Sequence, residues 1–178
     1  PNITLLNNKI DLIDDKCFYF DHYQAGYLCG QHLIDKGHSN IACITGWLIT
    51  NDGNQRHQGF LSALNDNNIN IPEELIFKGD YTYRKGYEGA LSLLKQDLPF
   101  TAIFCGNDQS AMSAIAAITN EGLQVPNDIS VIGYDDMNIA SYTSPPLTTV
   151  RIPFNRMAVS DTRRLLNLCY NLELDIDC

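Results

Sequence analysis

Short apolar runs alternate with helical patterns along almost the whole chain. The runs lie at residues 3–6, 18–20, 41–44, 75–77, 101–105 and 129–132. Most of them are continuous rather than alternating, which is typical of strands that are covered on both faces. We therefore expect a mainly parallel sheet built from these segments.

Between the runs, apolar residues recur at the spacing of amphipathic helices. Ala25, Leu28, Cys29 and Leu33 share one face of a helix that is expected to end at Gly37. Further helices are expected around residues 60–64, 87–94, 111–118 and 155–172, with a loop over residues 46–53. Strand and helix alternation predicts an α/β fold with right-handed crossovers between parallel strands.

Polar side chains follow several of the expected strands. Asn107 comes directly after residues 101–105, and Asp135 comes shortly after residues 129–132. Arg56 is expected one turn into the helix that follows residues 41–44. In open parallel sheets, ligands bind beyond the carboxyl ends of the strands. These side chains are therefore candidates for one binding site.

Their chemistry suits a neutral compound rich in hydroxyl groups. An Arg donates hydrogen bonds, an Asp accepts them, and an Asn does both. Tyr81 and Phe154 are aromatic residues that could cover the apolar face of a sugar ring. Structural roles remain open: Asn107 and Asp135 could cap helices, and Arg56 could form a solvated ion pair.

Composition excludes several classes of protein. The chain has 178 residues, 44% of them hydrophobic and 19% charged, with a net charge of −9. This composition indicates a soluble globular domain, or two small lobes, and a poor match for nucleic acid or an anionic membrane. Six cysteines occur without a Cys-x-x-Cys pair, which favours buried, reduced thiols over a disulfide framework or a metal site.

Motifs for other chemistries are missing from the sequence. The glycines form neither Gly-x-Gly-x-x-Gly nor a P-loop, and the four histidines lack zinc-ligand spacing. Ser110 is not in a Gly-x-Ser-x-Gly elbow. We therefore expect no enzyme, no cofactor and no bound metal.

Four stretches together match a known pattern. They are residues 20–41, the run Asn-Gln-Arg-His-Gln-Gly-Phe at 54–60, residues 100–115, and residues 125–150 with Val-Pro-Asn-Asp-Ile-Ser-Val-Ile-Gly-Tyr-Asp-Asp and Pro-Pro-Leu-Thr-Thr-Val. With these stretches the chain resembles the effector-binding domain of the LacI/GalR family of bacterial transcription repressors. The resemblance covers nearly the whole chain, and its last stretch is the most specific.

The resemblance implies two Rossmann-like lobes of the periplasmic-binding-protein type, with the ligand between them, cut at both ends. Residues 1–69 would form the later part of the N-terminal lobe, and residues 70–149 the C-terminal lobe. Residues 150–178 would cross back and end in a helix against the N-terminal lobe. A DNA-binding helix-turn-helix headpiece would precede Pro1.

A set of ligand-binding residues follows from the resemblance by position: Arg56, Asn107, Asp135, Tyr81, Phe154 and Gln24. The first three would hydrogen-bond sugar hydroxyls, and the two aromatic residues would stack on the ring or line the pocket. Gln24 stands where a lactose-type repressor has a ligand-contacting Asp, so the preference among hydroxyls stays open.

The resemblance also implies a mechanism and partners. The effector, a sugar or glycoside, would shift the placement of the lobes in a cytoplasmic homodimer and so change operator binding. Residues 109–120 and 137–144 are candidate dimer surfaces. Purines remain alternatives because the family includes a purine-sensing repressor. A periplasmic sugar-binding protein of a transporter is the main alternative function, and the six cysteines argue against it.

Overall fold

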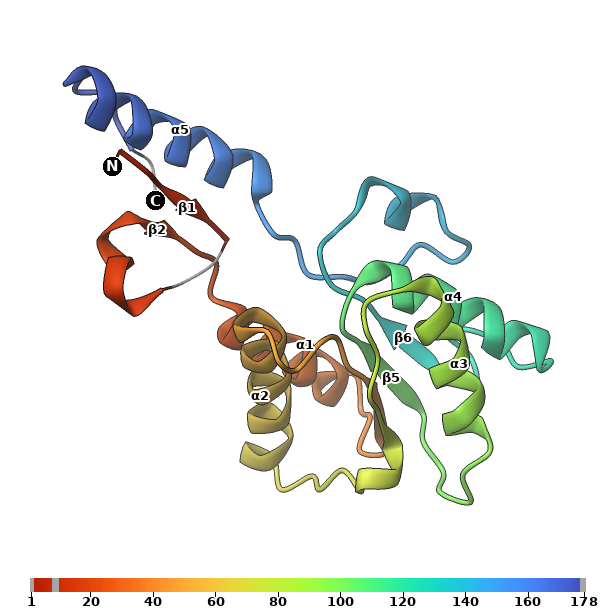
Figure 1. Cartoon of the computed structure of the whole chain (residues 1–178). Coiled ribbons are helices and arrows are strands. Elements are labelled where there is room, and N and C mark those ends of the chain that lie inside the picture. The colour runs from red at the N-terminus through yellow and green to blue at the C-terminus, as the bar shows by residue number, and fades with distance from the viewer. Residues whose placement is uncertain (1, 8–9, 177–178) are drawn as a thin grey trace. The chain divides into compact units, whose positions relative to one another are not determined.

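The computed structural model describes residues 2–7 and 10–176 (Figure 1). The chain divides into two compact units. The larger unit is His22–Arg151, and the smaller one combines Pro1–Asp21 with Ile152–Cys178. Each unit has its own strands and helices.

The larger unit is built on a parallel four-stranded sheet in the order β4-β3-β5-β6. The strands are β3 (Ile41–Ile44), β4 (Ile76–Phe77), β5 (Ala102–Cys105) and β6 (Ser130–Ile132). Every residue of β3 and β5 is buried, which explains why these runs are continuously apolar. The predicted α/β fold with parallel strands is confirmed.

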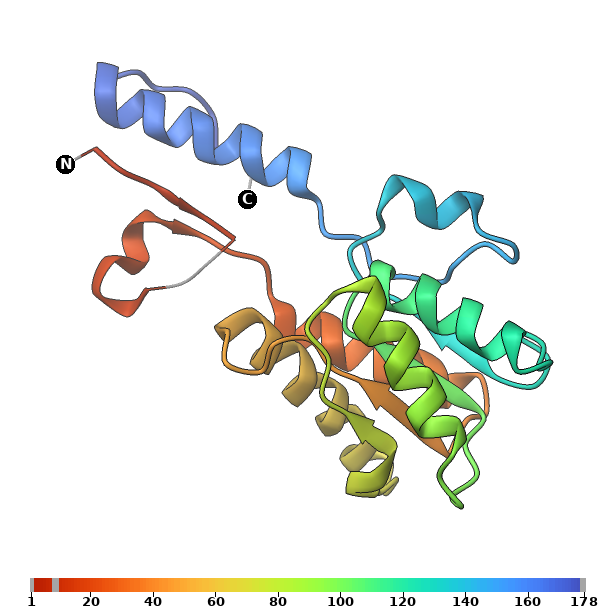
Figure 2. The same cartoon turned by 45° about the vertical axis from the view of Figure 1, so that its right-hand side comes forward.

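Helices cover both faces of this sheet, as Figures 1 and 2 show. Helices α1 (His22–Asp35) and α2 (Asn51–Asp66) pack together on one face, where the ring of Phe60 stacks on Phe104 of β5. Helices α3 (Tyr83–Leu94) and α4 (Asp108–Asn120) pack together on the other face. There Ala90 and Ala114 join Ile103 in the main apolar core.

Two glycines allow α1 and α2 to approach each other closely. A Cβ atom at Gly26 would overlap the main-chain oxygen of Arg56, and one at Gly59 would overlap the main-chain oxygen of Tyr23. The absence of side chains at these two positions therefore sets how near the N-terminal part of α1 lies to α2. This close approach positions Arg56, which is described below.

The predicted end of α1 is confirmed, whereas the predicted start of α2 is wrong. Helix α1 stops at Gly37 as predicted: Gly37 has φ +89°, and the N–H of His38 donates to the carbonyl oxygen of Leu33 at 3.1 Å. The loop predicted over residues 46–53 is too long. Helix α2 already begins at Asn51, because the Thr50 hydroxyl accepts a hydrogen bond from the N–H of Gly53 at 3.2 Å.

The smaller unit contains two short parallel strands and a long helix. Strand β1 (Leu5–Leu6) pairs with β2 (Cys17–Phe18), and η1 (Asp11–Lys16) connects them. Helix α5 (Phe154–Tyr170) contacts β1, and the Thr4 hydroxyl donates to Asp161 at 3.0 Å. The first and last segments of the chain are thus joined in one compact unit.

The two units do not divide at the predicted boundary between residues 69 and 70. That boundary lies inside the larger unit, just before η2 (Glu73–Leu75) and β4. Strand β3, on one side of the boundary, pairs with β4 and β5 on the other side. Because shared sheet hydrogen bonds join these segments, they cannot belong to separate lobes. A short helix, η3 (Asn138–Tyr142), follows β6 in this unit.

The described cysteines carry free thiols. Cys17, Cys29, Cys43 and Cys105 are buried, whereas Cys169 is exposed, and Cys178 lies outside the described residues. Burial raises the pKa of Cys29 to about 12, which keeps this thiol protonated and unreactive. Within residues 2–7 and 10–176, no helix is long and apolar enough to cross a membrane.

Candidate functional site

Four of the six predicted site residues come together beyond the carboxyl ends of β3, β4, β5 and β6. The guanidinium carbon of Arg56 lies 5.4 Å from the centre of the Tyr81 ring. The Asn107 amide donates to the main-chain oxygen of Tyr81 at 3.0 Å. Burial raises the pKa of Asp135, and Arg56 lies close enough for its charge to oppose that rise. Together with His22 and Tyr134, these residues are called the Arg56 cluster.

Arg56 is the centre of this cluster and is only 4% exposed. Its Nη1 donates to the main-chain oxygen of Gly106, and its guanidinium carbon lies 3.7 Å from the centre of the Tyr134 ring. The nearest carboxylate oxygen in an ion pair is that of Asp52, at 3.9 Å. The Nε atom is buried, and no described atom accepts its hydrogen bond. The alternative that Arg56 forms only a solvated ion pair is therefore wrong, because the side chain is buried and has contacts besides Asp52.

Two members of the cluster, His22 and Tyr134, were not identified from the sequence. The His22 Nδ1 atom lies 2.9 Å from the Tyr134 hydroxyl and 3.5 Å from Nη2 of Arg56. Both side chains are almost completely buried. His22 is the first residue of α1, and Tyr134 lies in the most specific stretch of the family resemblance. Of these two facts, only the position of Tyr134 in the family motif could have indicated a site residue from the sequence.

Asn107 has a clear structural role. Its side-chain oxygen accepts from the N–H of Ser110 at 3.0 Å and from the Ser110 hydroxyl at 2.7 Å, so it caps α4. Its amide nitrogen holds the main chain at Tyr81, where φ is +71°. The capping alternative for Asn107 is therefore correct. A direct contact between Asn107 and a ligand stays a prediction.

Asp135 is held in an unusual main-chain conformation. Its φ is +115°, and its N–H donates to the carbonyl oxygen of Val150 at 2.9 Å. Burial raises the pKa of Asp135 to about 6, and the carboxylates of Asp108 and Asp52 act in the same direction, while Arg56 opposes them. Asp135 caps no helix, since the helical turn that follows begins after Met137. Strained residues of this kind are concentrated at functional sites.

Asp108, which was not among the predicted site residues, holds the turn that carries Asp135. It is fully buried, and its two carboxylate oxygens accept from the N–H of Met137 at 2.7 Å and from the Thr149 hydroxyl at 2.6 Å. Its own N–H donates to the carbonyl oxygen of Tyr134 at 2.8 Å. Asp108 thus ties the start of α4 to residues on both sides of Asp135.

The other two predicted residues have different surroundings. Gln24 is exposed on the first turn of α1. Phe154 is the first residue of α5, belongs to the smaller unit, and is 43% exposed. Their roles in ligand binding stay predictions.

The Arg56 cluster has the side chains of a binding site. It offers a buried cation, a half-buried carboxyl group and aromatic rings, which are groups that recognise polar ligands. Among the residues that the structure describes, no group of three His, Cys, Asp or Glu side chains could hold a metal ion.

Residues 31–175 match a family model described as the periplasmic binding protein-like domain. The chain belongs to this family of ligand-binding domains, and within it to the effector-binding domains of the LacI/GalR transcription repressors.

One curated relative is the HTH-type transcriptional repressor PurR of Photorhabdus laumondii, 44% identical over 93% of this chain and 47% of its own length. A LacI-family transcriptional regulator from Burkholderia phymatum superimposes with a TM-score of 0.93 at 36% identity, over 99% of this chain and 64% of that structure. A sugar-binding LacI-family regulator from Escherichia coli, complexed with phosphate, gives a TM-score of 0.92 at 33% identity, over 98% of this chain and 63% of that structure.

These relatives are transcription regulators, so the comparisons do not favour the alternative of a periplasmic sugar-binding protein. The chain spans about half the length of the curated relatives it matches.

Proposed function

We propose that this chain is the effector-binding part of a transcription repressor, and that a small hydroxyl-rich effector binds at the Arg56 cluster. The family supports a ligand-binding role. One solved relative is described as sugar-binding, which supports a sugar or glycoside as the effector. The periplasmic transport function is not favoured, because the relatives named above are regulators.

The proposal depends on the observation that the Arg56 cluster contains buried polar groups. Arg56 is almost fully buried, and its Nε atom has no acceptor among the described residues. Beside it, Asp135 is an acceptor whose pKa burial raises to about 6. An unsatisfied donor and a desolvated carboxyl group both destabilise the ligand-free protein. A sugar hydroxyl, which donates and accepts, would satisfy both.

The proposed mechanism is a shift between placements of two lobes. An effector can shift such an equilibrium only by its difference in affinity for the two placements. Operator DNA would be bound by a helix-turn-helix region outside these 178 residues, as the name of the HTH-type relative suggests. The acidity of this chain supports that division, because DNA affinity comes mainly from Lys and Arg.

The regulator is proposed to act as a homodimer in the cytoplasm. Residues 109–120, on α4, and residues 137–144 remain the candidate dimer surfaces. Ile139 is 48% exposed and Tyr142 is 82% exposed, so this segment presents apolar side chains that a second copy could cover. The measurement is sedimentation equilibrium with Tyr142→Ser, which should weaken association.

The effector can be identified by a thermal-shift screen of sugars, glycosides, phosphorylated sugars and purines, since a ligand that binds only the folded state raises the melting temperature. Calorimetry with the best ligand should then show a loss of affinity of roughly tenfold or more for Arg56→Lys and Asp135→Asn. Arg84→Ala, at an exposed position on α3, is the matched control and should bind normally. Unchanged affinity in both cluster variants would show that the effector does not bind at this site.

A further inference from the structure

The larger unit has a cavity that shares no residue with the Arg56 cluster. Its volume is about 400 Å³, and fourteen residues line it. The C-terminal end of α1, strand β6 and two proline-containing segments form its walls. A volume of this size is within the range of small-molecule sites, which begins at roughly 300 Å³.

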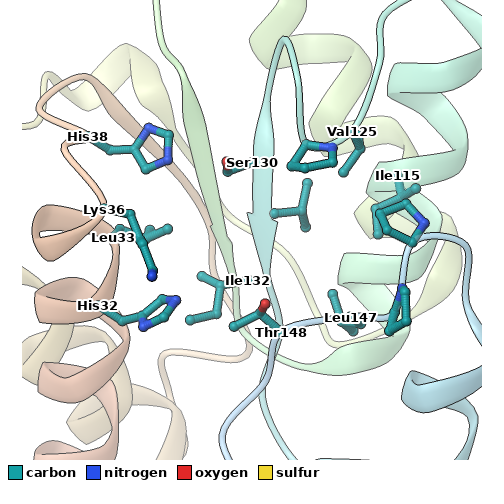
Figure 3. A pocket seen from close by; sticks show the side chains of 14 residues that line it. His32, Leu33, Lys36, His38, Ile115, Val125, Ser130, Ile132, Leu147 and Thr148 are labelled. Atoms are coloured by element: carbon teal, nitrogen blue, oxygen red, sulfur yellow. The ribbon is translucent and has the colours of Figure 1, made fainter.

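The two sides of this pocket differ in chemistry, as Figure 3 shows. His32, Lys36 and His38 stand on the side formed by α1 and the residues after it. The opposite side is apolar and consists of Ile115, Val125 and prolines at 126, 145 and 146. The hydroxyl-bearing residues Ser130 and Thr148 lie between the two sides. The pocket therefore offers an ammonium group and two imidazole rings to one end of a ligand and apolar surface to the other.

The charge of this pocket is opposite to that of the chain. The chain has 21 acidic and 12 Lys or Arg residues, yet none of the fourteen lining residues is acidic. In the part of the chain that the structure describes, Lys36 forms no ion pair. A positive pocket on an acidic protein attracts anions selectively.

The three basic side chains are not needed to terminate α1. The N–H groups of Gly37 and His38 donate to the carbonyl oxygens of Ile34 and Leu33 at 2.8 and 3.1 Å, so the main chain closes the helix by itself. The His38 ring is oriented by a 2.8 Å hydrogen bond between its Nδ1 atom and the Thr101 hydroxyl. Burial and then the neighbouring His32 lower the pKa of His38, an effect that a bound anion would oppose.

We propose that this pocket is a second ligand site, which binds a small organic anion through Lys36, His32 and His38 and places the apolar body of that anion against the proline side. The anionic group is a phosphate monoester or a carboxylate, since both accept hydrogen bonds from ammonium, imidazole and hydroxyl donors. The proposal does not depend on which effector the Arg56 cluster binds.

The test is calorimetry on the full chain with phenyl phosphate and benzoate as the two anionic probes, and with phenol and inorganic phosphate as the two halves of the first probe. At least one aromatic anion should bind, and phenol and inorganic phosphate should each bind at least tenfold more weakly. Lys36→Gln should weaken binding of that anion at least fivefold, and His32→Gln should weaken it to a smaller extent.

Two controls locate the site. Lys78→Gln removes the same charge at an exposed position outside the pocket and should change affinity less than twofold. Asp135→Asn should leave binding of the probes unchanged. The proposal is overturned if neither aromatic anion binds, if Lys36→Gln and Lys78→Gln have equal effects, or if only Asp135→Asn alters binding. A stronger response to phenyl phosphate or to benzoate assigns the anionic group.

Discussion

The two ends of helix α1 carry basic residues in opposite states. At its N-terminal end, His22 is buried against Tyr134 and Arg56. At its C-terminal end, Lys36 and His32 are exposed beside an open pocket. A helix of this length separates the two places by roughly 20 Å. One element therefore takes part in a closed polar cluster and in an open cationic pocket.

The difference shows that helix packing, rather than residue type, decides how a basic group behaves here. Gly26 lets α2 approach the N-terminal part of α1, and this approach encloses Arg56. Enclosure arranges the polar groups in advance, but it also costs stability, because desolvated charges are retained. At the open end there is no such cost, so substitutions there should affect ligands and leave folding almost unchanged.

The largest expected effect comes from closing the gap at Gly26. Gly26→Ala places a Cβ atom onto the main-chain oxygen of Arg56, so α1 and α2 must separate at this end. We expect a loss of roughly 2–3 kcal/mol in the free energy of unfolding, the usual cost of overpacking. Urea denaturation measures it.

Gly37→Ala, at the other end of the same helix, is the matched control. It has φ +89° and no atom within 4 Å of an added Cβ, so only the main-chain penalty of roughly 1 kcal/mol applies. Equal losses in the two variants would show that close helix approach does not set the difference between the ends.

The next effect is a gain of stability at the cluster. Burial raises the pKa of Asp135 from its ordinary 3.8 to about 6, so the folded state favours the protonated acid. The stabilisation from this group is complete below pH 3.8 and is lost as the pH rises through 6. Asp135→Asn should therefore raise stability at pH 7.5 by on the order of 1–2 kcal/mol, with little gain at pH 4.

Thermal unfolding at the two pH values measures this gain. Asp136→Asn is the control, because Asp136 has a positive φ as well but pairs with the exposed Arg151. An exposed pair contributes little, so this variant should change stability by less than about 1 kcal/mol at both pH values. If Asp135→Asn loses stability at pH 7.5, the carboxylate is favourably placed and the account of the cluster is wrong.

Local patterns were enough to predict much of the larger unit. The continuous apolar runs located β3 and β5, and Gly37 located the end of α1. Arg56, Asn107 and Asp135 follow strands in the sequence. They were predicted to lie near one another because parallel strands end at a common edge of the sheet. These features depend on residues that are close in the sequence or on one general rule of topology.

The parts that could not be predicted depend on contacts between distant segments. His22 is buried in contact with Tyr134, which is 112 residues away in the sequence. In the sequence, Asp108 looks like an ordinary surface acidic residue. In the structure it is fully buried and accepts hydrogen bonds from Met137 and Thr149. The wrong boundary at residue 69 has the same cause, since pairing between β3 and β4 is not visible in a linear pattern.

A smaller effect on stability is expected at Asn107, and it distinguishes capping of α4 from contact with the effector. Asn107→Ala removes the cap of α4 and should cost about 1 kcal/mol of unfolding free energy. Asn107→Ser keeps a capping oxygen and should recover most of that loss. If Asn107 contacts the effector, the affinity measured by calorimetry stays low in Asn107→Ser although its stability is restored. Recovery of both quantities would leave Asn107 with a structural role alone.

The smallest effect on stability is expected at the open end of α1. Lys36→Gln removes an exposed ammonium that has no ion pair among the described residues, while the main-chain bonds that close the helix remain. The unfolding free energy should change by less than about 0.5 kcal/mol, as is usual for such surface sites. Lys85→Gln is the comparison, since Lys85 forms a 2.9 Å ion pair with Glu88 on α3. Denaturation of both variants in parallel should show the greater loss for Lys85→Gln. A loss above 1 kcal/mol for Lys36→Gln would mean that this lysine stabilises the fold, and the contrast between the two ends of α1 would fail.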